Sequence, residues 1–143
     1  MAQSEILDLQ LFGDQAEFDH IGVAVASIQE ATQADPITVS DEHQRVSVAF
    51  VNVNGLNLEL IEPLGDDSPI HSSLKEMKQL VHVCFRVRNL EDAISKGREN
   101  GFHQIADPVP AKAFLDRKIV WVFSRTYGLI ELVERDDAAD PKA

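Results

Sequence analysis

FDHIGVAVASIQEA at residues 18–31 and LVHVCFRVRNLEDA at residues 80–93 are two versions of one segment, and this duplication sets the architecture of the chain. His20 aligns with His82 at an offset of 62 residues, and apolar residues alternate after each histidine as they do in a β-strand. Self-similarity at a fixed spacing is the signature of a repeated structural unit. The chain therefore contains the same unit twice.

The matching continues further along each copy. RVSVAFV (45–51) aligns with RKIVWVF (117–123), and ELIE (59–62) aligns with ELVE (131–134), both at an offset of 72 residues. Each copy thus brings a histidine at the start of one strand and a glutamate within a later strand. A doubled unit that supplies two histidines and two glutamates is the pattern of a four-ligand divalent-metal site.

Strand and helix signals follow the same order in both copies. A serine or asparagine cap precedes each helix, and a glycine marks the turn of each hairpin. The expected elements of the first copy are a strand over 18–25, a helix over 28–34 after Ser27, and strands over 45–53 and 56–62 around Asn54-Gly55. Those of the second copy are a strand over 80–87, a helix over 90–100 after Asn89, a short strand near 102–105, a loop over 107–116, and strands over 117–124 and 129–135.

Three segments fit the repeat less regularly. The offset grows from 62 to 72, so the first copy lacks ten residues after its helix, and ITVS (37–40) stands in for the extra strand or marks its reduction. Residues 70–78 are predicted to be helical. SEILDLQLF (4–12) predicts either a short helix or an added edge strand.

At 143 residues the chain has the length of one domain, in which two modules share a core. We expect module 1 over about 17–63, a linker helix within 64–79 and module 2 over about 80–135. The polar segment 136–143 lacks large apolar residues and is expected to be a flexible tail.

The composition argues against several kinds of partner. Against 13 Lys+Arg stand 24 Asp+Glu, and the net charge of −11 repels nucleic acid and anionic membrane surfaces. The single cysteine, Cys84, excludes an internal disulfide and suits a reducing compartment. The sequence shows neither a signal-peptide pattern nor an apolar stretch of 18 residues, so we expect a cytoplasmic protein that acts on a small molecule.

Strand alternation allows the four repeated residues to meet. His20 shares its face with small residues that leave room for a ligand, and His82 lies on the corresponding face of the second copy. Glu59 and Glu131 have apolar neighbours in strands that should be buried, and a lone buried carboxylate is costly unless it acquires a partner. Each residue alone fits a structural role, but the symmetric set of four favours a metal site.

Four segments resemble the vicinal oxygen chelate superfamily, which includes glyoxalase I, methylmalonyl-CoA epimerase, extradiol dioxygenases and bleomycin resistance proteins. They are DHIGVAV, VAFVNVNGLNLELIEPLGDDSPI, HVCFRVRNLEDAI and GLIELVE. The resemblance covers about 18–135, and ELIEPLGDDSPI is most similar to the epimerases. It implies an α+β fold of paired βαβββ modules, a curled mixed sheet around a metal cleft, and a homodimer.

The resemblance also implies a cofactor and an activity. One divalent ion (Co, Mn, Ni, Zn, Mg or Fe) is expected on His20, Glu59, His82 and Glu131, with Glu131 and Glu59 as catalytic carboxylates. The implied enzyme is a metal-dependent isomerase or lyase, similar to methylmalonyl-CoA epimerase, that acts on an acyl-CoA thioester through a metal-stabilised enolate.

Other functions of the same superfamily stay open. A glyoxalase I-type lactoylglutathione lyase uses the same four ligands, and a metal-free small-molecule binding or resistance protein uses the same fold. A dioxygenase is disfavoured, because its iron takes two histidines and one carboxylate and Glu59 would be a fourth ligand.

Substrate contacts are expected from three residues. Arg86 follows His82 on the open face and suits a carboxylate, and Lys112 lies in a loop and suits a phosphate, although both also fit a solvated surface. Gln44 keeps the place it has in the epimerases, while Arg45 replaces their glycine. Three histidines have no repeat partner and are expected to be structural or at the surface, with His43 at the cleft as an alternative: His43, His71 and His103.

Overall fold

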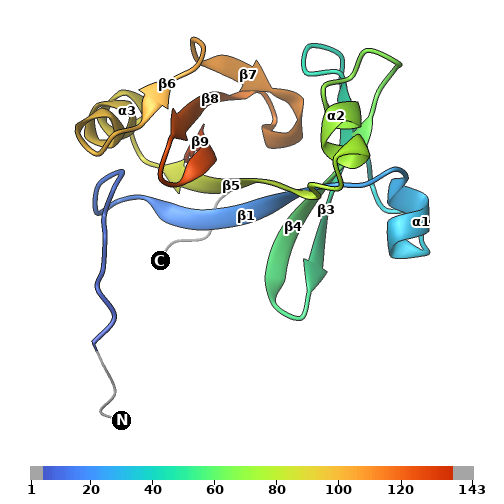
Figure 1. The fold of residues 1–143 in the computed structure, drawn as a ribbon, viewed down its shortest axis with the longest axis horizontal. Coiled ribbons are helices and arrows are strands. Elements are labelled where there is room, and N and C mark those ends of the chain that lie inside the picture. The colour runs from blue at the N-terminus through green and yellow to red at the C-terminus, as the bar shows by residue number, and fades with distance from the viewer. Residues whose placement is uncertain (1–4, 137–143) are drawn as a thin grey trace.

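The computed structural model describes residues 5–136, which form a mixed sheet of nine strands with three α-helices and a short 3-10 helix (Figure 1). The strands are β1 (Glu17–Ala24), β2 (Val39–Asp41), β3 (Val46–Val53), β4 (Leu56–Pro63), β5 (Leu80–Val87), β6 (His103–Gln104), β7 (Val109–Ala111), β8 (Arg117–Ser124) and β9 (Gly128–Glu134). The helices are α1 (Ile28–Thr32), α2 (Ile70–Lys75), α3 (Leu90–Glu99) and the 3-10 helix η1 (Lys112–Phe114).

The sheet joins two similar halves. The strand order is β2-β3-β4-β1-β5-β9-β8-β6, with β7 beside β8, and the sheet does not close. β1 and β5 pair antiparallel at its centre, and each has a parallel neighbour on its other side, β4 or β9. The first half therefore runs β1-α1-β2-β3-β4 and the second β5-α3-β6-β8-β9, which confirms the expected α+β fold of two βαβββ units.

Local sequence signals explain both capped helices. The Ser27 hydroxyl accepts the Glu30 backbone N–H at the start of α1, and the Asn89 side chain accepts the Asp92 N–H at the start of α3. α1 ends at Thr32, two residues earlier than predicted, because Gln33 adopts a left-handed conformation with φ of 56°.

The N-terminal arm differs from the prediction. Residues 5–16 form neither a helix nor an edge strand, and residues 1–4 lie outside the described range. The arm instead inserts Phe12, which is buried, against α3 and Phe102, with 4.7 Å between the two ring centroids. A Cβ atom at Gly97 would approach the Phe12 ring to 2.8 Å, so this packing depends on a glycine in α3.

The segment 107–116 was predicted to be a loop but contains β7 and η1. Its two prolines favoured a loop in the prediction. A strand at a sheet edge tolerates a proline, however, because the missing N–H costs no hydrogen bond of the sheet. β7 pairs antiparallel with β8, and Ala111 and Phe114 are buried beside Ile119. The tail predicted over 136–143 lies outside the described residues except for Asp136.

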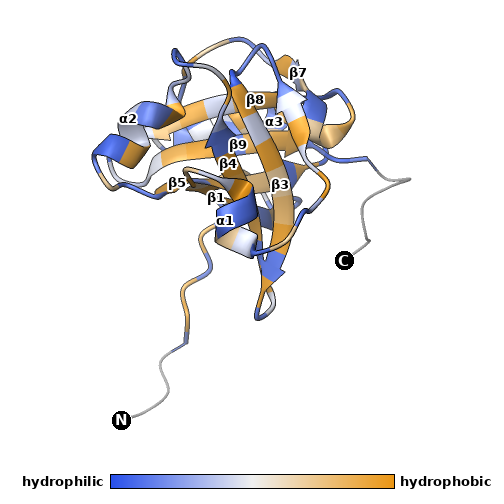
Figure 2. Ribbon diagram, turned by 90° about the vertical axis from the view of Figure 1, so that its right-hand side faces the viewer, coloured by the Kyte–Doolittle hydropathy of each residue, from blue (hydrophilic) through white to orange (hydrophobic). Residues whose placement is uncertain are grey.

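The two halves have separate hydrophobic clusters. α3 covers one, which includes Val120, Val122 and Leu132, while α1 packs over Ala49 and Leu60 at the other end of the sheet. Figure 2 shows hydrophobic residues concentrated on strands such as β3 and β8, whereas α1 is mostly hydrophilic. Within residues 5–136 no helix is long and apolar enough to cross a membrane.

Candidate metal centre

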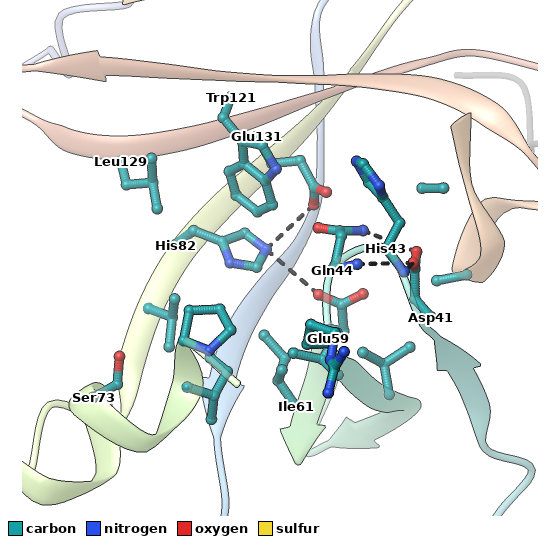
Figure 3. Close-up of a pocket in the computed structure, with 18 of the residues that line it drawn as sticks. Asp41, His43, Gln44, Glu59, Ile61, Ser73, His82, Trp121, Leu129 and Glu131 are labelled. Atoms are coloured by element: carbon teal, nitrogen blue, oxygen red, sulfur yellow. Dashed lines mark hydrogen bonds and ion pairs between the residues drawn. The ribbon is translucent and has the colours of Figure 1, made fainter. Parts of the chain in front are cut away.

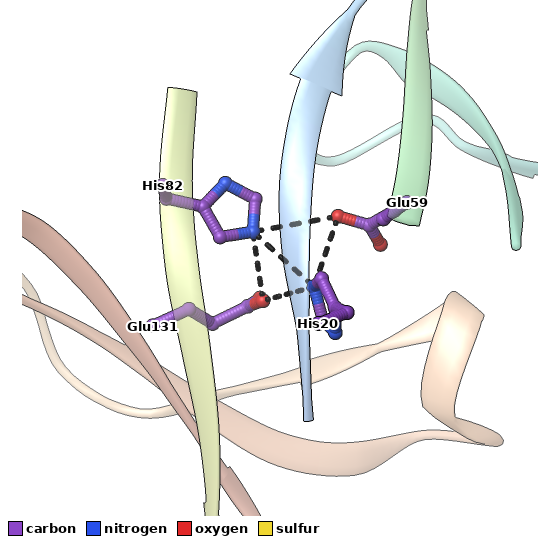
Figure 4. Close-up of side chains that lie close together, drawn as sticks. All are labelled: His20, Glu59, His82 and Glu131. Atoms are coloured by element: carbon purple, nitrogen blue, oxygen red, sulfur yellow. Dashed lines mark hydrogen bonds and ion pairs between the residues drawn. The ribbon is translucent and has the colours of Figure 1, made fainter. Parts of the chain in front are cut away.

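All four histidines and glutamates singled out by the repeat converge at the centre of the sheet (Figure 4). The Nε2 atoms of His20 and His82 lie 3.3 Å apart. Glu59 Oε1 lies 3.5 Å from each of these nitrogens, and Glu131 Oε1 lies 3.4 Å from His20 and 3.2 Å from His82. The four residues are almost completely buried, with exposed fractions between 0 and 5%.

The strand register explains why they meet. Gly22 of β1 pairs with Glu59 of β4, and Cys84 of β5 pairs with Glu131 of β9. Gly22 and Cys84 occupy equivalent positions of the repeat, so each module presents its glutamate in the same way. The antiparallel pairing of β1 with β5 then brings the two histidines together.

Gly22 has a second role. A Cβ atom there would lie between 2.1 and 2.8 Å from three atoms of the His82 ring. Real Cβ atoms do not approach a ring so closely, and the buried ring has little room to shift. The glycine therefore allows the His82 ring to lie directly against β1.

The donor set fits a divalent cation. Ligand atoms about 2.1 Å from an ion, at tetrahedral or octahedral angles, are separated by roughly 3.0–3.4 Å. The five separations given above, 3.2 to 3.5 Å, agree with this spacing. Glu131 Oε1 is buried, and its close polar contacts are the two histidine nitrogens, so its negative charge calls for a proton or a cation at this point. Two imidazoles and two carboxylates suit many divalent metals and do not select one.

Asp19 orients the first histidine. Its Oδ2 lies 2.7 Å from His20 Nδ1, so the ring proton is directed to Asp19 and Nε2 faces the other ligands. The register between β1 and β5 is irregular between Phe18 and His20, which marks a bulge at Asp19. Sequence reasoning missed this residue because neighbours in a regular strand point to opposite faces.

The protonation of the cluster follows from these contacts. Burial lowers the pKa of His20, but hydrogen bonds to Asp19, Cys84 and the two glutamates outweigh it and raise the pKa far above its ordinary value. Burial raises the pKa of Glu131, but hydrogen bonds and charge from the two histidines lower it to about 2. When no metal is bound, these contacts favour the positively charged form of His20, which offsets part of the charge of the neighbouring carboxylates. A bound cation would take the place of the proton on His20.

A pocket of about 480 Å³ leads to this cluster (Figure 3). Glu59, His82 and Glu131 line it. Apolar side chains from both modules form most of its wall: Val48, Ile61, Ile70, Ala113, Phe114, Trp121 and Leu129. The 41–45 turn adds polar side chains: Asp41, His43, Gln44 and Arg45.

The three residues predicted to contact the substrate differ in whether they line the pocket. Gln44 lines the pocket, and its amide donates to Asp41 Oδ2. Lys112 is not among the lining residues, and its ammonium lies 3.9 Å from Asp116 Oδ1. Arg86 also lies outside the pocket, where it forms ion pairs with Asp19 and Glu17. Of the three residues, Gln44 alone lines the pocket, and Arg86 forms structural ion pairs instead.

Of the three remaining histidines, one lines the pocket and two do not. His43 lines the pocket, as the alternative interpretation of the sequence had it. His71 Nε2 lies 2.9 Å from the Gly65 carbonyl oxygen, a structural contact at the loop before α2. His103 is exposed on β6.

Comparison with known proteins places this geometry in a family. Residues 19–121 match the family profile of the glyoxalase/bleomycin resistance protein/dioxygenase superfamily. The chain is 35% identical over 127 residues to the uncharacterized protein YqjC of Bacillus subtilis, covering 81% of this chain and 90% of that protein. It is 29% identical over 131 residues to the mitochondrial methylmalonyl-CoA epimerase of Mus musculus, covering 84% and 72%.

A solved structure shows the same fold. A variant of Streptomyces coelicolor methylmalonyl-CoA epimerase, in complex with 2-nitronate-propionyl-CoA, superposes with a TM-score of 0.71 at 22% identity. The match covers 87% of this chain and 98% of that one. The duplicated sequence, the paired modules and these matches agree, and the chain belongs to the glyoxalase/bleomycin resistance protein/dioxygenase superfamily.

Proposed function

We propose that this protein is a divalent-metal-dependent epimerase that inverts a carbon atom next to the carbonyl group of an acyl-CoA thioester. The observation that carries the proposal is the buried cluster of His20, Glu59, His82 and Glu131 beside a pocket. The similarity to methylmalonyl-CoA epimerases over most of the chain supports the reaction type.

The cluster suits proton transfer next to a carbonyl group. A divalent ion on these residues would polarise the carbonyl oxygen and stabilise the negative charge that develops on proton removal. Glu59 and Glu131 enter the cluster from strands on opposite sides of the central pair β1 and β5. One carboxylate can accept a proton from one face of the substrate while the other returns a proton to the opposite face. This exchange of faces is what an epimerase requires.

The pocket suits the rest of such a substrate. Its apolar wall excludes water from the carbon that loses its proton, which strengthens the charge interactions at the cluster. The Streptomyces coelicolor relative was solved with a propionyl-CoA analogue, which supports a CoA thioester as the substrate class. We further propose a homodimer, by analogy with the family, which sedimentation equilibrium would test.

The test is proton exchange in deuterated water. Protein loaded separately with Co, Mn, Ni, Zn, Mg or Fe is incubated with methylmalonyl-CoA, and loss of the signal of the proton at carbon 2 is followed by NMR. Glu131→Gln and Glu59→Gln are each expected to lower the exchange rate by about a hundredfold or more, which is the range typical of acid–base catalysis. Glu134→Gln, at the end of the same strand as Glu131, is the matched control.

Two results would contradict the proposal. Exchange that is equally fast in both glutamine variants would remove the carboxylates from the reaction. Turnover of the glutathione hemithioacetal of methylglyoxal, without exchange in methylmalonyl-CoA, would identify a glyoxalase I-type lyase instead. Metal content measured by elemental analysis accompanies each assay, so that loss of the ion is separated from loss of chemistry.

A further inference from the structure

The pocket has one full positive charge that the metal centre does not use. Among its lining residues, all of which lie in the described part of the chain, Arg45 is the one lysine or arginine. A divalent ion and two carboxylates sum to zero charge, so the metal centre supplies no net positive charge for an anionic group elsewhere on the substrate. The chain as a whole carries a net charge of −11, which repels anions. An anion in this pocket therefore depends on Arg45.

The backbone of Arg45 lies several residues along the hairpin from the metal centre. Glu59 pairs with Phe50, and Arg45 directly precedes β3, five residues before Phe50. At about 3.3 Å per residue, the α-carbons of Arg45 and Phe50 are roughly 16 Å apart. Arg45 thus faces the part of a substrate that is remote from the reacting carbon.

The backbone around Arg45 fixes this position. Arg45 has φ of 60°, an uncommon conformation for a residue other than glycine, and its carbonyl oxygen accepts the Leu64 N–H at 3.0 Å. Its guanidinium lies against Gly65, where a Cβ atom would approach Nη2 to 2.8 Å. The segment Leu64-Gly65 therefore packs against Arg45 and holds its side chain in place.

The guanidinium retains capacity for a ligand. Its Nη2 pairs with Asp67 Oδ1, a carboxylate that is 69% exposed, and such exposed ion pairs contribute little. Arg45 Nε is buried without a hydrogen-bond partner among the described residues. The side chain as a whole is 42% exposed, so an incoming oxyanion can replace Asp67 at its accessible N–H groups.

We propose that Arg45 binds the anionic end of the substrate's thiol carrier, and that this anion is the diphosphate of CoA. The inference rests on the proposed function. Coenzyme A separates its thioester from its diphosphate by the whole pantetheine arm, which suits the distance between Glu59 and Arg45. In a glutathione adduct both carboxylates lie fewer bonds from the sulfur than the diphosphate does in CoA, so they reach less far toward Arg45.

Titration calorimetry with the metal-loaded protein tests this assignment. Arg45→Ala is expected to weaken CoA binding by about tenfold to a hundredfold, the loss typical of a hydrogen bond to a charged group. Binding of pantetheine, which lacks the diphosphate, is expected to stay unchanged. The matched control is Arg98→Ala, which removes one exposed arginine from α3. Asp67→Asn, which frees the guanidinium, is expected to tighten CoA binding.

Each outcome has a definite meaning. Equal CoA affinity in Arg45→Ala and Arg98→Ala overturns the inference, even if the wild type epimerises methylmalonyl-CoA normally. A loss of glutathione binding in Arg45→Ala, together with no CoA binding by the wild type, overturns the assignment to CoA. No proton exchange by the wild type on any thioester overturns the proposed function itself. Should Arg45→Ala fail to fold, Arg45→Gln removes the same charge, and Asp67→Asn tests the pairing from the other side.

Discussion

Asp19 determines which nitrogen of His20 is available to a metal. Because its carboxylate holds the Nδ1 side of the ring at 2.7 Å, Nε2 points into the cluster without rotational freedom. His82 has no such partner, since its Nδ1 is buried without a hydrogen bond among the described residues. The two histidines are equivalent in the sequence repeat, but in the described part of the chain only His20 has a side chain that orients its ring. Metal binding by His20 should therefore depend on Asp19.

Asp19→Ala is therefore expected to lower the affinity for Co²⁺ or Zn²⁺ by about tenfold to a hundredfold, the usual effect of losing a group that orients a metal ligand. Competition with a chromophoric chelator measures the affinity. Glu17→Ala is the control, because Glu17 also pairs with Arg86 but does not contact His20. Equal affinities in the two variants would show that strand packing alone orients the ring.

The residues of the cluster differ in how visible they were in the sequence. The four ligand residues were found because the repeat aligns His20 with His82 and Glu59 with Glu131. Asp19 was hidden because a bulge turns it toward the ring, and bulges leave no pattern in the apolar periodicity. Arg45 was noticed only as a departure from the epimerases, since its place in the pocket depends on the Gly65 loop, which is distant in sequence.

Asp41 connects the two modules at the rim of the pocket. The residue closes β2, is 5% exposed, and accepts the backbone N–H groups of His43 and Gln44 through Oδ1. Its Oδ2 accepts the Gln44 amide and, at 3.5 Å, the N–H of Lys112 in η1. Burial raises the pKa of Asp41, but these hydrogen bonds outweigh it and lower the pKa below its ordinary value.

Asp41→Ala is expected to lower the free energy of unfolding by about 2 kcal/mol, the typical cost of losing hydrogen bonds to a buried charged group. It should also raise KM for a thioester more than it lowers kcat, because Gln44 and η1 line the pocket without belonging to the metal cluster. Denaturant unfolding and steady-state kinetics measure both effects. Asp66→Ala, in an exposed loop, is the control, and unchanged stability in Asp41→Ala would exclude this link between the modules.

At the level of helices and strands, prediction succeeded where a local signal exists. Alternating residues located β1, β3, β4, β5, β8 and β9, and the polar caps located α1 and α3. β7 and η1 were missed because their backbone is held by pairing with β8 and by burial of Phe114, and both depend on residues elsewhere in the chain. The N-terminal arm was mispredicted for the same reason, since Phe12 packs on α3 rather than extending the sheet.

The stability of the whole molecule should depend on pH through the buried cluster where a metal is expected. In the metal-free protein the pKa of His20 is raised, so the stability it supplies is complete below pH 6.5 and decreases as the pH rises toward the folded value. The pKa of Glu131 is lowered to about 2, so its contribution is present above pH 4.5 and is lost as the pH falls toward 2. The metal-free protein should be most stable between these two limits.

Thermal unfolding between pH 6.5 and 9 tests this expectation. The free energy of unfolding of the metal-free protein should fall by up to about 1.4 kcal/mol per pH unit, the value for one proton bound in the folded state alone. With a bound divalent ion the decline should disappear, because the ion replaces the proton on His20. Calorimetry in buffers of different ionisation enthalpy should then show release of about one proton per ion at pH 8.

His20→Gln is the variant that isolates the effect, since it removes the titrating ring while keeping an uncharged polar side chain at the same position. Its metal-free form should lose the decline above pH 6.5 and should take up metal weakly. A flat profile in the metal-free wild type, or metal binding without proton release, would mean that His20 is already neutral. The two carboxylates would then have to be balanced by another charge in the buried cluster.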